Sequence, residues 1–94
     1  MAVSVAAQRL SKRETGMPHV NVRMYAGRSD EDKARLAEAI GQALVQTLGS
    51  SERSISVAIE DVEPDAWMAE VYAPEITGKE DRLYKRPGYG PTSG

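Results

Sequence analysis

Residues 18–31 read PHVNVRMYAGRSDE, and this stretch decides the fold. Its first eight residues alternate, with the apolar side chains of Val20, Val22 and Met24 on one face of an extended chain. Alternation with a period of two, rich in β-branched residues, predicts a half-buried strand. Ser29 is then a good helix N-cap, and the acidic residues after it suit the positive end of a helix dipole. A strand leading into a helix is therefore expected here.

The helix predicted after Ser29 continues to residue 48. Apolar residues recur at helical spacing along it, and Gly49 supplies the usual left-handed stop. Residues 54–61 then alternate again, which predicts a second strand. The order strand, helix, strand with short connections implies an α/β fold built on a right-handed β-α-β unit with parallel strands.

A short second helix is expected from Glu63-Pro64-Asp65, because proline is tolerated at the first helical position. Trp67 and Val71 would share a face of this helix, and Pro74 should end it. The remaining sequence indicates a turn and a C-terminal tail that packs on another surface. Two strands leave a polar sheet face and two edges open, so we expect a second copy of the chain to cover that face.

Composition limits the function classes. The chain has 94 residues, no cysteine and a formal net charge of −2, which favour one small domain that gains buried area by oligomerisation. The negative charge argues against nucleic-acid binding, and no apolar run of about 18 residues is present to cross a membrane. One histidine among scattered carboxylates lacks the spacing of metal ligands. We therefore expect no metal or other cofactor. We expect the protein to be located in the cytoplasm.

Residues 1–17 differ from the rest in charge. From residue 18 onward there are nine Lys/Arg and thirteen Asp/Glu, whereas the first 17 residues are basic and contain Arg9, Lys12, Arg13 and a single acid, Glu14. We expect residues 1–17 to be a leader, disordered or absent from the mature chain, ahead of one domain at residues 18–94. A start codon assigned too far upstream, a disordered extension and a processed transit peptide are the alternatives.

Loss of the leader would change the chemistry of Pro18. Inside a chain, proline nitrogen is a tertiary amide with no basicity, but at the N-terminus it is a secondary amine. An apolar pocket and a nearby cation would both lower the pKa of such an amine. A neutral amine can take a proton from one atom of a substrate and return it to another, which is a tautomerisation.

Three blocks of this sequence resemble the 4-oxalocrotonate tautomerase family without gaps: Pro18, Gly27-Arg28-Ser29-Asp30-Glu31 and residues 54–60. The tail around residues 83–89 is similar to a longer, mostly bacterial subgroup of dimers that act on phenylenolpyruvate-type enols. The resemblance implies a cofactor-free keto–enol tautomerase of an enol or 2-oxo carboxylic acid, with N-terminal Pro18 as general base. It also implies a homodimer, with a hexamer as the alternative.

The resemblance implies substrate-binding residues as well. Arg28 matches the arginine that binds a substrate carboxylate. A strand of about eight residues spans roughly 25 Å, so Arg28 would serve the Pro18 of a neighbouring subunit. Trp67 matches the pocket aromatic, although a core position explains it equally. Ser56 replaces a second family arginine, which argues against the dicarboxylate substrate of the founding enzyme.

His19 follows the proline directly and could hydrogen-bond an enol oxygen, or it could be structural. Lys85 and Arg86 could stand in for the second arginine, or be surface charges on the tail. Two other functions stay open. The same amine could activate water for hydration or dehalogenation, and a chain that keeps its leader would be a non-catalytic binding or assembly module.

Overall fold

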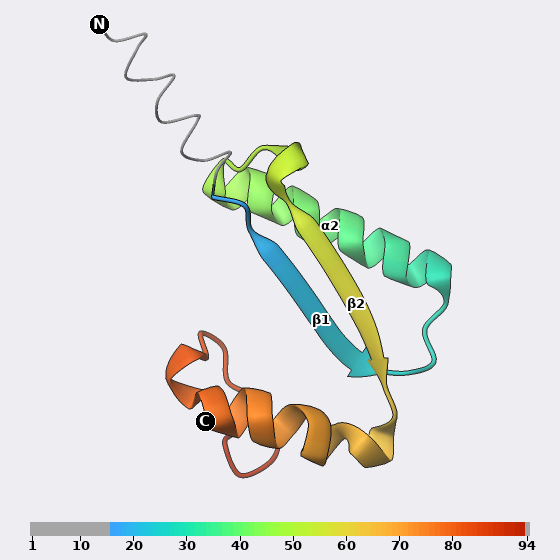
Figure 1. The fold of residues 1–94 in the computed structure, drawn as a ribbon, viewed down its shortest axis with the longest axis vertical. Helices are drawn as coiled ribbons and strands as arrows, with labels where there is room; N and C mark the ends of the chain where they lie inside the picture. Colours follow the sequence, from blue (N-terminus) through green and yellow to red (C-terminus); the bar gives the residue numbers. More distant parts are fainter. Residues whose placement is uncertain (1–15, 94) are drawn as a thin grey trace, which may run out of the picture. The chain divides into compact units, whose positions relative to one another are not determined.

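The computed structural model describes residues 16–93, which contain the strands β1 (His19–Tyr25) and β2 (Ser56–Val62) and the long helix α2 (Asp30–Leu48). A second helical region follows β2 (Figure 1). The chain divides into two compact units. The first runs up to Val22 and resumes at Arg28–Glu60, and the second comprises Arg23–Gly27 and the chain from Asp61 onward.

The two strands form a parallel sheet, as predicted, and both arrows point the same way in Figure 1. At one end the N–H of Ser56 donates to the carbonyl of Pro18 at 3.2 Å, and at the other the N–H of Ala26 donates to the carbonyl of Val62 at 3.0 Å. In a parallel ladder these two bonds pair Ser56 with His19 and Val62 with Tyr25. The register is therefore constant along the sheet.

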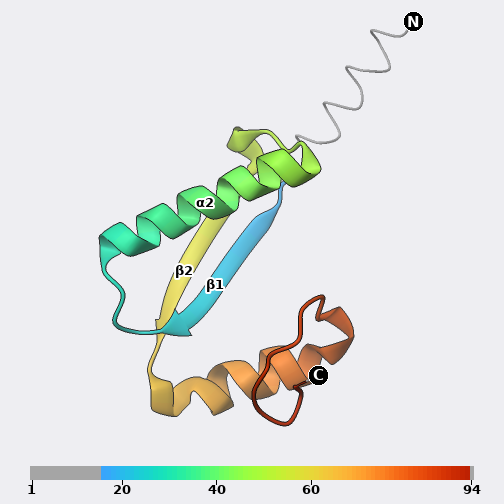
Figure 2. The same cartoon turned by 180° about the vertical axis from the view of Figure 1, so that it is seen from behind.

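Helix α2 begins and ends where its caps require. The Ser29 Oγ accepts a hydrogen bond from the N–H of Asp32 at 3.1 Å, and Gly49 adopts a left-handed φ of 72° that ends the helix. The predicted helix over residues 30–48 is confirmed. Within the first unit α2 lies across one face of the strands (Figures 1 and 2), where Ala37, Ile40 and Leu44 are half-buried.

The second helical region begins at Pro64, as predicted, with a 3₁₀ turn over Pro64–Ala66. The expectation that Pro74 ends the helix is wrong, because a wide, π-type helix runs through it over Met68–Ile76. Proline has no N–H, and in a π-type helix each N–H bonds to the carbonyl five positions earlier, so Pro74 cannot donate to the carbonyl of Ala69. A guanidinium N–H of Arg23 donates to the carbonyl of Glu70, four residues before the proline, at 3.2 Å.

The most deeply buried apolar side chains of the described residues are Val62, Val71 and Tyr72, all in the second unit. The tail packs against this core. The Tyr72 hydroxyl donates to the carbonyl of Tyr89 at 3.0 Å and accepts from the N–H of Thr92 at 2.8 Å. Both hydrogen bonds hold the tail on the helix of its own chain.

Two residues on the polar face of β1 contact the second helical region within this same unit. Arg23 forms an ion pair with Glu75, and the Tyr25 ring meets the Trp67 ring edge-on with centroids 5.3 Å apart. These contacts leave Tyr25 53% exposed, so the covering of the polar face by a second copy stays a prediction. Long-range contacts of this kind leave no periodic signal in the sequence.

Candidate functional site

Pro18, His19 and Ser56 lie together at the start of the sheet. Besides the backbone bond between Ser56 and Pro18, the His19 Nδ1 and the Ser56 Oγ share a hydrogen bond of 2.6 Å. The register causes this arrangement, because it pairs positions 19 and 56. Both side chains are exposed, and Pro18 is half-buried. The structure thus joins the predicted base, the predicted histidine and the residue at the position of the missing arginine.

The residue before Pro18 lies at the surface. Met17 is 64% exposed and has a φ of 49°, in the left-handed region that a residue with a Cβ rarely adopts. Its side chain therefore gains little from burial. Of the predicted leader, residues 1–15 lie outside the described residues.

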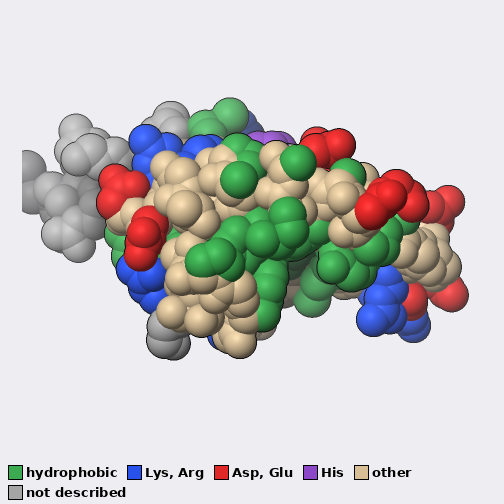
Figure 3. Space-filling model, turned by 90° about the horizontal axis from the view of Figure 1, so that it is seen from below, with side chains coloured by type: hydrophobic (Ala, Val, Ile, Leu, Met, Phe, Trp, Pro, Cys, Tyr) green, Lys and Arg blue, Asp and Glu red, His purple; other side chains and the backbone are tan. Residues whose placement is uncertain are grey.

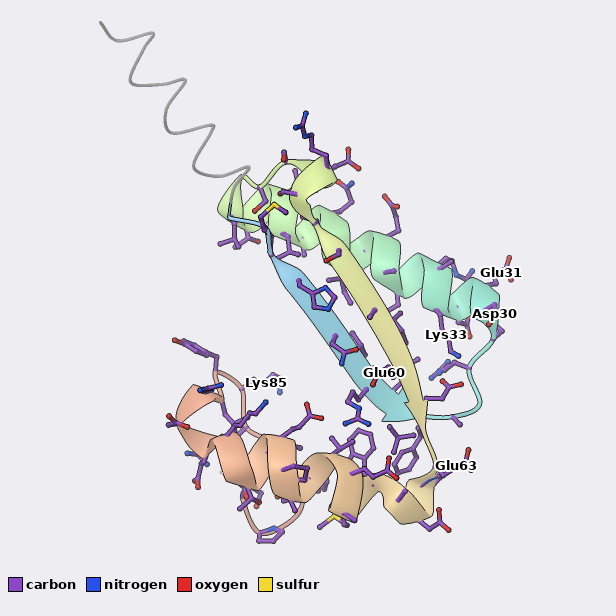
Figure 4. All side chains as sticks on the ribbon, viewed as in Figure 1. Asp30, Glu31, Lys33, Glu60, Glu63 and Lys85 are labelled. Atoms are coloured by element: carbon purple, nitrogen blue, oxygen red, sulfur yellow. The ribbon has the colours of Figure 1, made fainter. Side chains whose placement is uncertain are left out.

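Arg28 lies at the other end of β1, in the connection to α2. Its side chain is 69% exposed, and its Nη1 lies 3.7 Å from the Asp32 Oδ2. Figure 4 shows Asp30, Glu31 and Lys33 around the first turn of α2. The seven residues of β1 separate Arg28 from Pro18 by roughly 23 Å of extended chain. A single chain does not bring these two residues together.

Trp67 belongs to an aromatic cluster of the second unit. Its edge-on contact with Tyr25 is one part, and its indole N–H donates to the Tyr89 hydroxyl at 2.8 Å. The indole is half-buried. Sequence reasoning missed Tyr89, because no local pattern links a residue to a tryptophan 22 positions earlier. The Pro87-Gly88 pair just before Tyr89 is a sequence signal for a turn, and it indicates that the chain could fold back here.

The basic residues of the tail are placed differently from one another. The Arg86 Nη1 donates to the Glu80 Oε2 at 2.8 Å and to the carbonyl of Thr92 at 3.3 Å. These bonds tie Arg86 into the tail. Lys85 projects from the C-terminal part of the chain in Figure 4.

A hollow of about 420 Å³ lies between α2 and β2 in the first unit. Its wall includes small helix residues, the strand residue Val57 and the residue just before β2: Ala34, Ala37, Gly41, Ile55 and Val57, beside Glu38, Gln42 and Glu52. None of the predicted site residues lines it. It therefore gives no support to a substrate position at this place.

Neither a metal site nor a membrane span is found among residues 16–93. No three His, Asp or Glu side chains there are grouped so that they could hold a metal ion. None of the helices in this part of the chain is both long and apolar enough to cross a bilayer. Figure 3 shows hydrophobic side chains gathered on one surface. The exposed large hydrophobic side chains of the described residues include Tyr25, Met68 and Tyr89.

Residues 18–75 match the model of a protein family described as "Tautomerase enzyme". A "Probable tautomerase" of Xylella fastidiosa is 43% identical over 74 residues, which cover 79% of this chain and 90% of the relative. Tautomerase PptA of Pectobacterium carotovorum is 42% identical, over 78% of this chain and 97% of its own length. The crystal structure of YwhB, a homologue of 4-oxalocrotonate tautomerase, matches 51% of this chain and 79% of its own, with 44% identity and a TM-score of 0.50.

Proposed function

The chain belongs to the tautomerase family, and on that premise we propose that it is a cofactor-free keto–enol tautomerase with Pro18 as its general base. In this proposal the residues before Pro18 are removed, and the substrate is an enol or 2-oxo carboxylic acid. The observation that carries it is the placement of Pro18. This residue is the first of the family match and stands at the start of β1 beside two polar side chains, after an exposed methionine.

The reaction needs only the transfer of one proton. The neutral amine of Pro18 accepts the proton of the enol hydroxyl, and the electrons of that O–H bond form the carbonyl. The electrons of the carbon–carbon double bond take the proton back from the protonated amine, forming a new C–H bond. Nothing is oxidised or reduced overall. His19 would donate a hydrogen bond to the oxygen on which charge develops.

Two further residues complete the proposed site. Arg28 would bind the substrate carboxylate with its planar guanidinium, and it would do so for the Pro18 of a neighbouring subunit. The separation of the two residues along β1 supports this division between chains. Trp67 would supply an apolar wall, and its bond to Tyr89 and contact with Tyr25 hold the indole in one orientation.

The test compares three purified chains that begin at residue 18: the unmodified chain, Pro18→Ala and Pro18→Gly. Ketonisation of phenylenolpyruvate, followed by ultraviolet absorbance, should fall by about 10²-fold or more in both variants, the range expected for loss of a general base. Circular dichroism should show that both keep the fold. Because both variants retain a primary amine, any residual rate is compared between them.

A fourth chain that keeps Met17 is the matched control. Its Pro18 nitrogen is an amide, so it should be as inactive as the variants. Full activity in this chain, or in Pro18→Gly, would overturn the assignment of the base. The intact mass of the protein from its natural source then decides between an enzyme and a non-catalytic binding or assembly module.

A further inference from the structure

We propose that Ser56 is a positioning residue for His19. Its hydroxyl would hold the imidazole in the tautomer that carries the proton on Nε2, ready to donate that N–H to a substrate oxygen next to Pro18. The inference rests on the proposed function, because it assumes that the substrate reacts at Pro18. It gives a role to the position where the family arginine is missing.

The contacts of Ser56 carry this inference. Its hydroxyl lies 2.6 Å from the Nδ1 of His19, and its backbone N–H binds the carbonyl of Pro18 at 3.2 Å. One residue of β2 thus holds both the proposed base and the neighbouring ring. Side chain and backbone make separate contacts, so removing the hydroxyl leaves the backbone bond in place.

The chemistry of imidazole determines what the contact does. A neutral imidazole has one nitrogen that donates and one that accepts, and a serine hydroxyl can take either role. When the Ser56 hydroxyl donates to Nδ1, the proton of His19 must sit on Nε2, at the opposite edge of the ring. This N–H is then a neutral donor that can stabilise the negative charge developing on an enol oxygen.

The chain offers a direct measurement, because it has a single histidine. The ¹⁵N chemical shifts of the imidazole, recorded at about pH 9 where imidazoles are neutral, report the ratio of the two tautomers without a substrate. The chains to compare begin at Pro18 and carry Ser56, Ser56→Ala or Ser56→Thr. The unmodified and Ser56→Thr chains should both have a larger Nε2–H fraction than Ser56→Ala.

The kinetics should follow the tautomer. Ser56→Ala should lower kcat by about 10-fold, the size of one hydrogen bond, with less than about a twofold change in KM. Ser56→Thr keeps the hydroxyl and should restore most of the rate. In a chain that already carries His19→Ala, Ser56→Ala should have no further effect, because the two residues act as one unit.

Two results would overturn the proposal. One is a tautomer ratio in Ser56→Ala equal to that of the unmodified chain. The other is an equal loss of kcat from Ser56→Ala with and without His19, which would mean that Ser56 acts on the substrate itself. Failure of the proposed function would look different: Pro18→Gly would stay fully active, while the tautomer ratio would still respond to Ser56.

Discussion

At the scale of single residues, Arg28 and Arg35 offer a matched pair for testing the substrate anchor. Both side chains are exposed, and both contact the carboxylate of Asp32, at 3.7 Å and 2.5 Å. Arg28→Ala should raise KM by about 10- to 100-fold, the cost of losing a charge-assisted hydrogen bond. Arg35→Ala should leave KM unchanged. Steady-state kinetics of the two variants make the comparison.

The same two variants separate an effect on substrate binding from an effect on the free energy of unfolding. Exposed ion pairs contribute only about 0–1 kcal/mol, so both variants should unfold in urea within that range of the unmodified chain. Equal KM values for Arg28→Ala and Arg35→Ala would remove Arg28 from the proposed site.

At the scale of elements, the docking of the tail on the second helix depends on Gly90. This residue has a φ of 78°, and a Cβ on it would lie 2.4 Å from the Tyr72 hydroxyl. Gly90→Ala should therefore lower the free energy of unfolding by about 1–3 kcal/mol, through backbone strain and overpacking. Gly88 is the matched control, because its added Cβ would meet nothing within 4 Å.

Tryptophan fluorescence adds a second readout of the tail. The single Trp67 is hydrogen-bonded to Tyr89, the neighbour of Gly90, so its emission should shift in Gly90→Ala and not in Gly88→Ala. Identical urea transitions for the two variants would contradict the tail contacts described above.

The cap of α2 is a second element-scale test. Ser29→Ala removes the acceptor of the Asp32 N–H and should cost about 1 kcal/mol of stability. Ser29→Asp keeps an acceptor at this position and should cost much less. Urea unfolding followed by circular dichroism measures both, and equal losses would show that the cap does not matter.

At the scale of the whole molecule, the small core indicates that a single chain buries too little apolar surface to be stable without a partner. No residue of α2 is fully buried, and Leu36, Leu48 and Met68 are among the large apolar side chains left exposed. We expect an oligomer whose stability rises by about 1.4 kcal/mol for each tenfold increase in concentration, if it is a dimer. Thermal unfolding over a dilution series, with sedimentation for the mass, measures this. A single-chain mass with a constant Tm would contradict it.

A site that takes Pro18 from one chain and Arg28 from another makes a further prediction about the oligomer. At a substrate concentration well below KM, Pro18→Gly and Arg28→Ala chains should each have little activity. When they are unfolded together and refolded, some sites combine an intact Pro18 with an intact Arg28. Random mixing should restore about one quarter of the activity of the unmodified chain. If each site took Pro18 and Arg28 from the same chain, mixing the two variants would restore no activity.

The sequence by itself determined the parts of this protein that depend on neighbouring residues. The bounds of α2 follow from Ser29 and Gly49, and alternation indicates both strands, because caps and periodicity act within a few residues. Family membership also follows from short blocks, led by Pro18. The roles of Pro18, Arg28, Trp67 and His19 remain predictions.

Only the tertiary structure decided which distant residues meet. The bond between His19 and Ser56 spans 37 positions, and that between Trp67 and Tyr89 spans 22. The helix that continues through Pro74 likewise has the guanidinium of Arg23, 47 positions before Glu70, on the carbonyl of Glu70. Such contacts arise from strand register and packing, which bring together residues that no local pattern connects.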